Sequence, residues 1–353
     1  MKIKLLILFF AVILIVSCEP DEDSKSRQFP FASEQDIDSD ELIKAYENAE
    51  DIVGLKSLLV SRNGVLVSEE YFTEMGADDL FETRSVTKSI VSALIGIAIE
   101  EGFLTSTNQK LKEFLTPLGY TLEDEKANIT IEHLLTMSAG FEWNEFESGY
   151  SYRDWVIDDD QIEYCINGIL ENDPGEEFGY SSEEAHLLSV VLTEATGMST
   201  HDFAFEYLFE PLGMSIEDFS WGEFPQGYFN GGADLSLKPK DMIKIGNLFL
   251  NNGSYNGNEI VSSNWIQEST NAHISTNLGG YVPDYGYLWW MNRSGADNYY
   301  FANGYGGQLI GIFPDLELVI VTTSEWQLST NDAGQQWYNV MSLVMNDVLS
   351  SVN

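Results

Sequence analysis

Basic residues, histidine and cysteine are all scarce in this sequence. Only 17 Lys and Arg stand against 57 Asp and Glu among 353 residues, so the formal net charge is −40. Such a charge repels a phosphate backbone, which excludes nucleic acid as a partner. Four histidines and two cysteines leave little material for a zinc site or a disulfide framework. We therefore expect neither a metal centre nor a fold that depends on disulfide bonds.

Apolar residues, in contrast, are plentiful. They make up 44% of the chain, and aromatic residues alone make up 13%. This is ample material for a hydrophobic core, so a disordered acidic chain is excluded despite the charge. The length of 353 residues fits one large domain or two closely associated ones.

The N-terminus predicts export and lipidation. Two lysines precede an apolar run over 5–16, a pattern typical of a secretory signal and too short for a membrane span. The following Ser-Cys ends a segment that resembles a bacterial lipobox, in which Cys18 becomes the lipidated first residue. We predict a signal peptide over 1–17, a membrane anchor at Cys18 and an acidic tether over 18–40. The protein would then be an exported bacterial lipoprotein of the cell envelope, at the outer membrane or cell surface.

Strand patterns lie near both ends of the chain, and mainly helical patterns lie between them. An Asn-Gly turn between two apolar runs predicts a β-hairpin over 55–72. The helix predicted over 85–101 is apolar on nearly all faces, so we expect it to be buried in the middle of the molecule. The other clear predictions are helices over 41–50, 239–250 and 333–349, and strands over 285–290, 299–302, 308–313 and 316–323.

This order of elements predicts an α+β fold. One antiparallel sheet is built from both chain ends and flanked by helices, and a mainly helical lobe is inserted between them. We place the sheet lobe at about 41–104 and 280–353, and the helical lobe at about 105–279, within one domain over 41–353.

Ser85 and Lys88 form an S-x-x-K motif at the start of the apolar helix. One turn of helix separates them, which places the hydroxyl and the amine on the same face. A serine hydroxyl becomes a good nucleophile when a base removes its proton, and burial can lower the pKa of a lysine enough for that role. The helix N-terminus also offers free N–H groups to an oxyanion. Because the motif is common by chance, a capping serine beside a surface lysine is the alternative.

Further segments make the chain resemble a known group of enzymes. Together with the S-x-x-K helix, they are similar to motifs of the serine β-lactamase and penicillin-binding-protein superfamily. The similarity is greatest to its class C-like branch of esterases, D-aminopeptidases and 6-aminohexanoate-dimer hydrolases, and it covers roughly 55–346. The segments are His133-Leu-Leu-Thr-Met-Ser-Ala-Gly140, Pro174-Gly-Glu-Glu-Phe-Gly-Tyr-Ser-Ser182, Gly231-Gly-Ala-Asp-Leu-Ser-Leu-Lys-Pro-Lys-Asp-Met242, Tyr285-Gly-Tyr-Leu-Trp-Trp290 and Gly304-Tyr-Gly-Gly-Gln308.

The resemblance implies a β-lactamase-like fold with the active site between the two lobes. It makes Ser85 the nucleophile, Lys88 its basic partner and Tyr180 the shared acid and base. The oxyanion hole would consist of the backbone N–H groups of Ser85 and Tyr305. A core aromatic is the alternative role for Tyr180. No cofactor is implied.

The chain departs from the family pattern at two places. Ser182 stands where the family's Tyr-x-Asn motif has its amide, and Ala302-Asn303-Gly304 stands where the family usually has a Lys or His followed by Thr-Gly or a similar pair. Without that cation, the carboxylate of a β-lactam or a D-Ala-D-Ala peptide lacks its partner, a loss worth roughly a few kcal/mol. Ser182, Asn303 and Gly304 are candidate substrate contacts. Trp155 is a further candidate, although core packing would equally explain it.

These observations predict a serine hydrolase that cleaves a small-molecule ester or amide through an acyl-enzyme on Ser85. A β-lactamase or D-Ala-D-Ala carboxypeptidase acting on cell-wall-like substrates is the alternative within enzymes. A catalytically inactive binding or sensor domain of the same fold is the alternative from another class.

Overall fold

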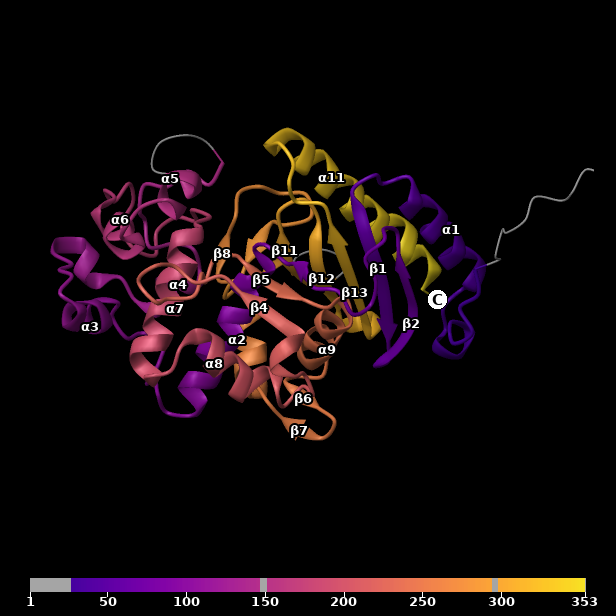
Figure 1. Ribbon diagram of the computed structural model, residues 1–353, viewed down its shortest axis with the longest axis horizontal. Coiled ribbons are helices and arrows are strands. Elements are labelled where there is room, and N and C mark those ends of the chain that lie inside the picture. The colour runs from indigo at the N-terminus through magenta and orange to yellow at the C-terminus, as the bar shows by residue number, and fades with distance from the viewer. Residues whose placement is uncertain (1–26, 147–150, 294–297, 353) are drawn as a thin grey trace, which may run out of the picture.

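A computed structural model of the protein describes residues 27–146, 151–293 and 298–352 (Figure 1). The predicted signal peptide and Cys18 lie outside the described residues. Within them, no helix combines the length and apolar character that crossing a bilayer requires. Cys165 is a buried free thiol.

The centre of the fold is an eight-stranded antiparallel sheet in the order β2-β1-β13-β12-β11-β10-β9-β8. The first hairpin pairs directly with the last strand, because β1 lies against β13 from Leu55↔Ser324 to Arg62↔Leu318. The predicted sheet built from both chain ends is thus confirmed. The strands are β1 Leu55–Arg62, β2 Val65–Tyr71, β8 Ile274–Ser275, β9 Asp284–Tyr285, β10 Trp290–Asn292, β11 Tyr299–Gly304, β12 Gln308–Phe313 and β13 Leu318–Ser324.

Helices α3 to α8 form a lobe beside the sheet, at the end of the molecule opposite α1 and β2 (Figure 1). A small sheet of β3 Phe81–Glu82, β5 Leu235–Leu237 and β4 Phe219–Trp221 and a hairpin of β6 Ser254–Tyr255 and β7 Asn258–Glu259 complete the strands. The helices are α1 Ser39–Glu50, α2 Val86–Glu100, α3 Lys112–Leu115, α4 Ile131–Leu135, α5 Tyr152–Val156, α6 Gln161–Asn167, α7 Ser182–Thr196, α8 Thr200–Ala204, α9 Pro239–Leu250, α10 Ser263–Ser269 and α11 Thr330–Ser342.

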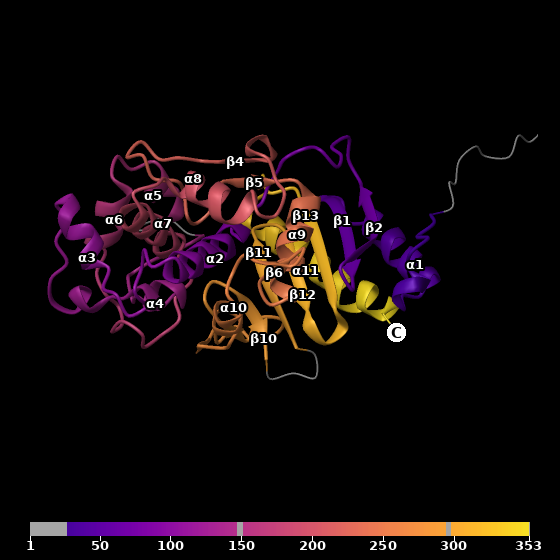
Figure 2. The same ribbon diagram turned by 90° about the horizontal axis from the view of Figure 1, so that it is seen from below.

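Helix α2 lies between the two lobes, as its apolar sequence predicts (Figure 2). Every residue from Val86 to Ala98 is buried, including Gly96. The helix packs against α7 on one side and β11 on the other. Just beyond its end, Gly102 has a φ of +78°, a left-handed conformation that favours glycine. The N-terminus of α2 is therefore held firmly at the junction of the lobes.

The predicted hairpin is confirmed, but one predicted strand is wrong. Asn63 and Gly64 both have positive φ, as a tight two-residue turn requires. The segment 285–290 is not one strand, because it turns back so that Tyr285 pairs with Trp290. Leu288 has a φ of +61° within this turn, and its N–H donates to the carbonyl oxygen of Leu135. This long-range bond to the helical lobe has no signature in the local sequence.

Three predicted boundaries also need correction. Residues 27–40 are not a free tether, because Arg27 pairs with Glu50 and Glu70 and Ile37 bridges to Val352. The second segment of the sheet lobe begins well before residue 280, because β8 joins the sheet and α9 packs on β1, β12 and β13. The last helix starts three residues earlier than predicted, and a π-helical turn over Leu343–Val348 continues it.

Candidate active site

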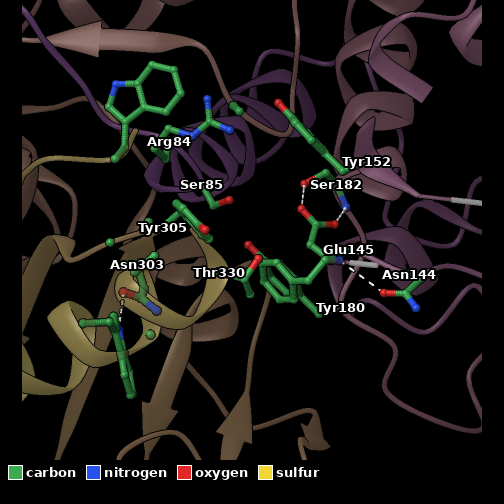
Figure 3. Close-up of a pocket in the computed structure, with 18 of the residues that line it drawn as sticks. Arg84, Ser85, Asn144, Glu145, Tyr152, Tyr180, Ser182, Asn303, Tyr305 and Thr330 are labelled. Atoms are coloured by element: carbon green, nitrogen blue, oxygen red, sulfur yellow. Dashed lines mark hydrogen bonds between the residues drawn. The ribbon is translucent and has the colours of Figure 1, made fainter. Parts of the chain in front are cut away.

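A cavity of about 1310 Å³ opens between the two lobes at the N-terminus of α2 (Figure 3). The helical lobe contributes the segment 143–146 and α5, and the sheet lobe contributes the end of β11 and the segment 326–337. The wall is mainly apolar. The aromatic lining residues are Trp143, Phe146, Tyr152, Phe178, Tyr180, Trp290, Tyr305, Trp326 and Trp337.

Ser85 lines this cavity as the N-cap of α2. The preceding residue, Arg84, has a φ of +49°, so the chain turns sharply into the helix. A non-glycine residue with positive φ is uncommon and is found often at functional sites. The turn leaves the Ser85 side chain half-buried, at the floor of the cavity and next to the partial positive charge of the helix N-terminus.

Lys88 lies one turn further along α2 and is only 1% exposed. Its Nζ donates to Ser85 Oγ at 3.0 Å, to Ser182 Oγ at 2.8 Å and to the carbonyl oxygen of Gly232 at 2.8 Å. Burial lowers the pKa of this amine to about 8, and the charge of Glu145 opposes part of that decrease. A lysine with such a pKa is neutral often enough near neutral pH to accept a proton.

Tyr180 stands beside this pair. Lys88 Nζ lies 4.8 Å from the centre of the Tyr180 ring, and Trp290 packs against the ring at 5.2 Å. Burial raises the pKa of the Tyr180 phenol above its ordinary value, and interaction with the Ser85 side chain offsets a small part of the rise. The phenol therefore holds its proton at neutral pH and is able to donate it.

Glu145 is a member of the site that sequence reasoning missed. Its Oε1 accepts a hydrogen bond from Ser182 Oγ at 2.5 Å, and its Oε2 accepts from Ser182 N at 3.0 Å and Trp143 Nε1 at 2.7 Å. Ser182 thereby joins Lys88 to a carboxylate. With 57 acidic residues in the chain, no local pattern distinguishes this one.

Arg84 is the second group whose place in the site is visible only in the structure. It lines the cavity next to Ser85, with Trp326 at 4.7 Å and Tyr152 at 5.8 Å from its guanidinium carbon. Glu82 and Asp234 both form ion pairs with it. Its charge is therefore already engaged within the protein.

The remaining predicted contacts have mixed outcomes. Asn303, Gly304 and Tyr305 line the cavity, and Tyr305 lies beside Ser85 (Figure 3). Asn303 Oδ1 accepts a hydrogen bond from Trp337 Nε1 at 2.9 Å. Trp155 is completely buried and packs against its neighbours in the helical lobe, so the prediction that it contacts substrate is wrong. Residues that are distant in the sequence surround the ring, so the local sequence does not indicate its burial.

Gly304 allows two parts of the site to approach closely. A Cβ built on Gly304 would lie 2.4 Å from the carbonyl oxygen of Thr83. Any side chain here would push β11 away from the turn that leads into α2. Among the described residues, no group of three or more His, Cys, Asp or Glu side chains is placed to hold a metal ion.

Comparison with known proteins identifies the family of the chain. The family model described as Beta-lactamase matches residues 40–345, which is most of the chain. The chain belongs to the Beta-lactamase family. The resemblance found in the sequence motifs is thereby confirmed, together with the α+β fold that it implied.

A curated relative and several structural neighbours of this chain are hydrolases or penicillin-binding-protein homologues. The 6-aminohexanoate-dimer hydrolase of Paenarthrobacter ureafaciens is 23% identical over 314 residues, covering 83% of this chain and 77% of that protein. The octameric penicillin-binding protein homologue from Pyrococcus abyssi has a TM-score of 0.69 at 16% identity, covering 89% of this chain and 78% of that one. A family VIII carboxylesterase has a TM-score of 0.63 at 16% identity, covering 87% of this chain and 98% of that one. Family and neighbours support hydrolase activity.

Proposed function

We propose that this protein is a serine hydrolase that cleaves an ester or amide through an acyl-enzyme on Ser85. The observation that carries the proposal is the buried Lys88 amine, 3.0 Å from Ser85 Oγ at the floor of a large cavity. A buried lysine with a lowered pKa beside a serine at a helix N-terminus is suited to covalent catalysis. A capping serine beside a surface lysine, the alternative, does not fit an amine that is 1% exposed.

Acylation begins with neutral Lys88. Its lone pair accepts the Ser85 hydroxyl proton while Ser85 Oγ bonds to the substrate carbonyl carbon, and the carbonyl oxygen becomes an oxyanion. Backbone N–H groups of Ser85 and Tyr305 would stabilise that charge. The Tyr180 phenol donates its proton to the leaving oxygen or nitrogen as the scissile bond breaks, and protonated Lys88 returns a proton to Tyr180.

Deacylation reverses this sequence with water in place of the leaving group. Water loses a proton to the Tyr180 and Lys88 pair as its oxygen attacks the acyl carbon. Ser85 Oγ then leaves and recovers its proton, which restores the starting state. General acid–base steps of this kind contribute about 10²–10⁴-fold to a rate.

The cavity favours a neutral substrate with an apolar group over a carboxylate. Its wall is mainly apolar, Arg84 is already ion-paired, and the Asn303 side chain is neutral and accepts a hydrogen bond from Trp337 Nε1. Arg153 also lines the cavity, but Glu145 and Asp154 do so too, so the charged lining residues offer an anionic substrate no net positive charge. An ester or amide with an aliphatic or aromatic acyl group therefore fits better than a β-lactam.

The test compares the mature wild-type protein with Ser85→Ala. Both are assayed with a short-chain p-nitrophenyl ester and a chromogenic cephalosporin. Ester turnover that depends on Ser85 and exceeds cephalosporin turnover supports the proposal. Cephalosporin turnover of comparable efficiency would favour the β-lactamase alternative, and an inactive wild type would favour a binding or sensor domain.

We also propose that the protein is an exported lipoprotein held to the cell-envelope membrane through Cys18. The motif ending at Cys18 supports this placement. Wild-type protein expressed with its own N-terminus should fractionate with membranes, and Cys18→Ala should remain an unlipidated precursor. Equal fractionation and equal mass of the two proteins would contradict the proposal.

A further inference from the structure

Lys88 Nζ forms hydrogen bonds with Ser85, Ser182 and Gly232, and the last two can only accept from it. Gly232 offers a carbonyl oxygen 2.8 Å from Nζ, which can only accept a hydrogen bond. The position of this carbonyl is well defined, because Gly232 N donates to Asn230 Oδ1 at 2.9 Å. A Cβ on Gly232 would lie 2.7 Å from the carbonyl oxygen of Ser182, so only glycine allows this close approach.

Ser182 is the second neighbour, and Glu145 decides which way its hydroxyl points. A hydroxyl has one proton. Ser182 Oγ donates that proton to Glu145 Oε1 at 2.5 Å, and the carboxylate has none to give back. Toward Lys88 Nζ, 2.8 Å away, Ser182 Oγ is therefore left as an acceptor only.

We propose that Glu145 and Ser182 are positioning residues that aim the lone pair of neutral Lys88 at Ser85 Oγ. A neutral amine has two N–H bonds and one lone pair. Ser182 and Gly232 both accept, so they take the two N–H bonds. The remaining tetrahedral direction points at Ser85, where the lone pair is needed. The Ser85 O–H bond then breaks as a new N–H bond forms on Lys88. This inference rests on the proposed function.

The segment that carries Glu145 is anchored at both sides of the cavity. Trp143 donates to Glu145 Oε2 and packs against Trp155 at 6.1 Å. Phe146 stacks on Tyr305 at 6.2 Å, across the cavity on the sheet lobe. Figure 3 shows the Glu145 carboxylate turned toward Ser182. The hydrogen bond from Trp143 holds the carboxylate where it fixes the Ser182 hydroxyl.

Three charged groups act on Lys88 from the elements around it. The charges of Glu145 and Asp234 raise the pKa of the amine, and the charge of Arg84 lowers it. The Tyr180 ring faces the same Nζ and remains uncharged at neutral pH. Removing the Glu145 charge therefore lowers the pKa of Lys88 and leaves the other groups in place.

Glu145→Gln tests the proposal with little change of shape. Two N–H groups converge on Oε2, so the amide oxygen is expected there and the amide NH₂ faces Ser182 Oγ. The Ser182 hydroxyl must then accept from Gln and turn its own proton toward Lys88, which occupies the lone pair. We expect kcat/KM on a neutral p-nitrophenyl ester to fall about 100-fold, within the range of lost general-base catalysis.

The pH profile separates positioning from a general structural defect. In Glu145→Gln the acidic limb of kcat/KM should move to lower pH, because the charge that raises the Lys88 pKa is gone. Glu142→Gln is the matched control, since it removes an acid from the same segment that does not line the cavity. It should keep both the wild-type rate and the wild-type limb.

A double-mutant cycle decides whether Glu145 acts through Ser182. Ser182→Ala alone should lose about 10- to 100-fold, and adding Glu145→Gln to it should cost less than about threefold more. Wild-type rate and pH limb in Glu145→Gln would overturn the inference. An equal loss from Glu145→Gln with and without Ser182 would also overturn it. An active Ser85→Ala protein would instead overturn the proposed function.

Discussion

The two sides of the cavity are built in different ways. On one side, Ser85 and Lys88 belong to a helix whose side chains from Val86 to Ala98 are all buried, and hydrogen bonds surround the lysine. On the other, aromatic rings on connecting segments, such as Trp143, Phe146 and Trp326, form part of the wall, and Phe146 is 58% exposed. In the proposed mechanism, the rigid side provides the groups for bond cleavage and the aromatic side contacts the substrate.

A rigid catalytic side and a separate aromatic binding surface would allow one fold to act on different substrates. Changes on the buried side should reduce the rate for every substrate alike. Changes on the aromatic side should alter preference among substrates and leave the chemical step intact. Substitutions on each side test that division, and those on the buried side should have the larger effect.

Lys88→Arg should have the largest effect. Arginine does not give up its proton in the accessible pH range, so it cannot act as the base. We expect kcat/KM to fall by more than about 10³-fold on every ester tested, as for other members of a catalytic unit. Steady-state assays check the rate, and circular dichroism checks the fold. Activity within tenfold of wild type would contradict the role of Lys88.

The acidic limb of the pH profile should reflect the ionisation of Lys88. Burial lowers the pKa of Lys88 to about 8, and the neutral amine is the active form in the proposed mechanism. The neutral fraction rises with pH, so kcat/KM should rise through about pH 8 and fall about tenfold per unit below it. A pH series on one ester measures the limb. A flat profile between pH 6 and 9 would contradict the assignment.

Phe146→Ala tests the aromatic side of the cavity. The ring stacks on Tyr305 and lines the cavity but is half exposed, so its loss removes about 1 kcal/mol of apolar contact to a long acyl chain. We expect about a fivefold rise in KM for p-nitrophenyl octanoate and little change for the acetate. The pH limb should remain that of wild type. A shifted limb would show that the two sides are not separable.

Asn303→Lys should produce the smallest change. It places a cation on the β11 edge of the cavity, where a carboxylate-bearing substrate would meet it. A partly exposed ion pair is worth at most about 1 kcal/mol, so preference for cephalosporin over neutral ester should rise about 2- to 5-fold. Asn303→Gln is the neutral control. A change of the same size in both variants would argue against a charge effect.

Much of the fold and part of the site could be predicted from local sequence. The hairpin at Asn63-Gly64 and helix α2 follow from turn chemistry and from an apolar run, which are properties of neighbouring residues. The spacing of Ser85 and Lys88 follows from helix geometry. Local patterns of this kind are readable because the physics behind them acts over a few residues.

The rest depends on contacts between distant segments. Glu145 is significant only because Ser182, 37 residues later, donates to it. The turn that divides β9 from β10 depends on a bond between Leu288 and Leu135. The local sequence allows Trp155 either to line a cavity or to pack in a core, and contacts with distant residues place it in the core. The ordered segment at Arg27 likewise depends on partners far along the chain.

The central claim is that Ser85 becomes acylated, and a covalent probe tests it most directly. Mature wild-type protein and Ser85→Ala are incubated with a fluorophosphonate, and the adduct is located by peptide mass spectrometry. The account predicts one adduct on Ser85 of the wild type and none on the variant. Unlabelled wild-type protein, or an adduct of equal yield on Ser85→Ala, would contradict it.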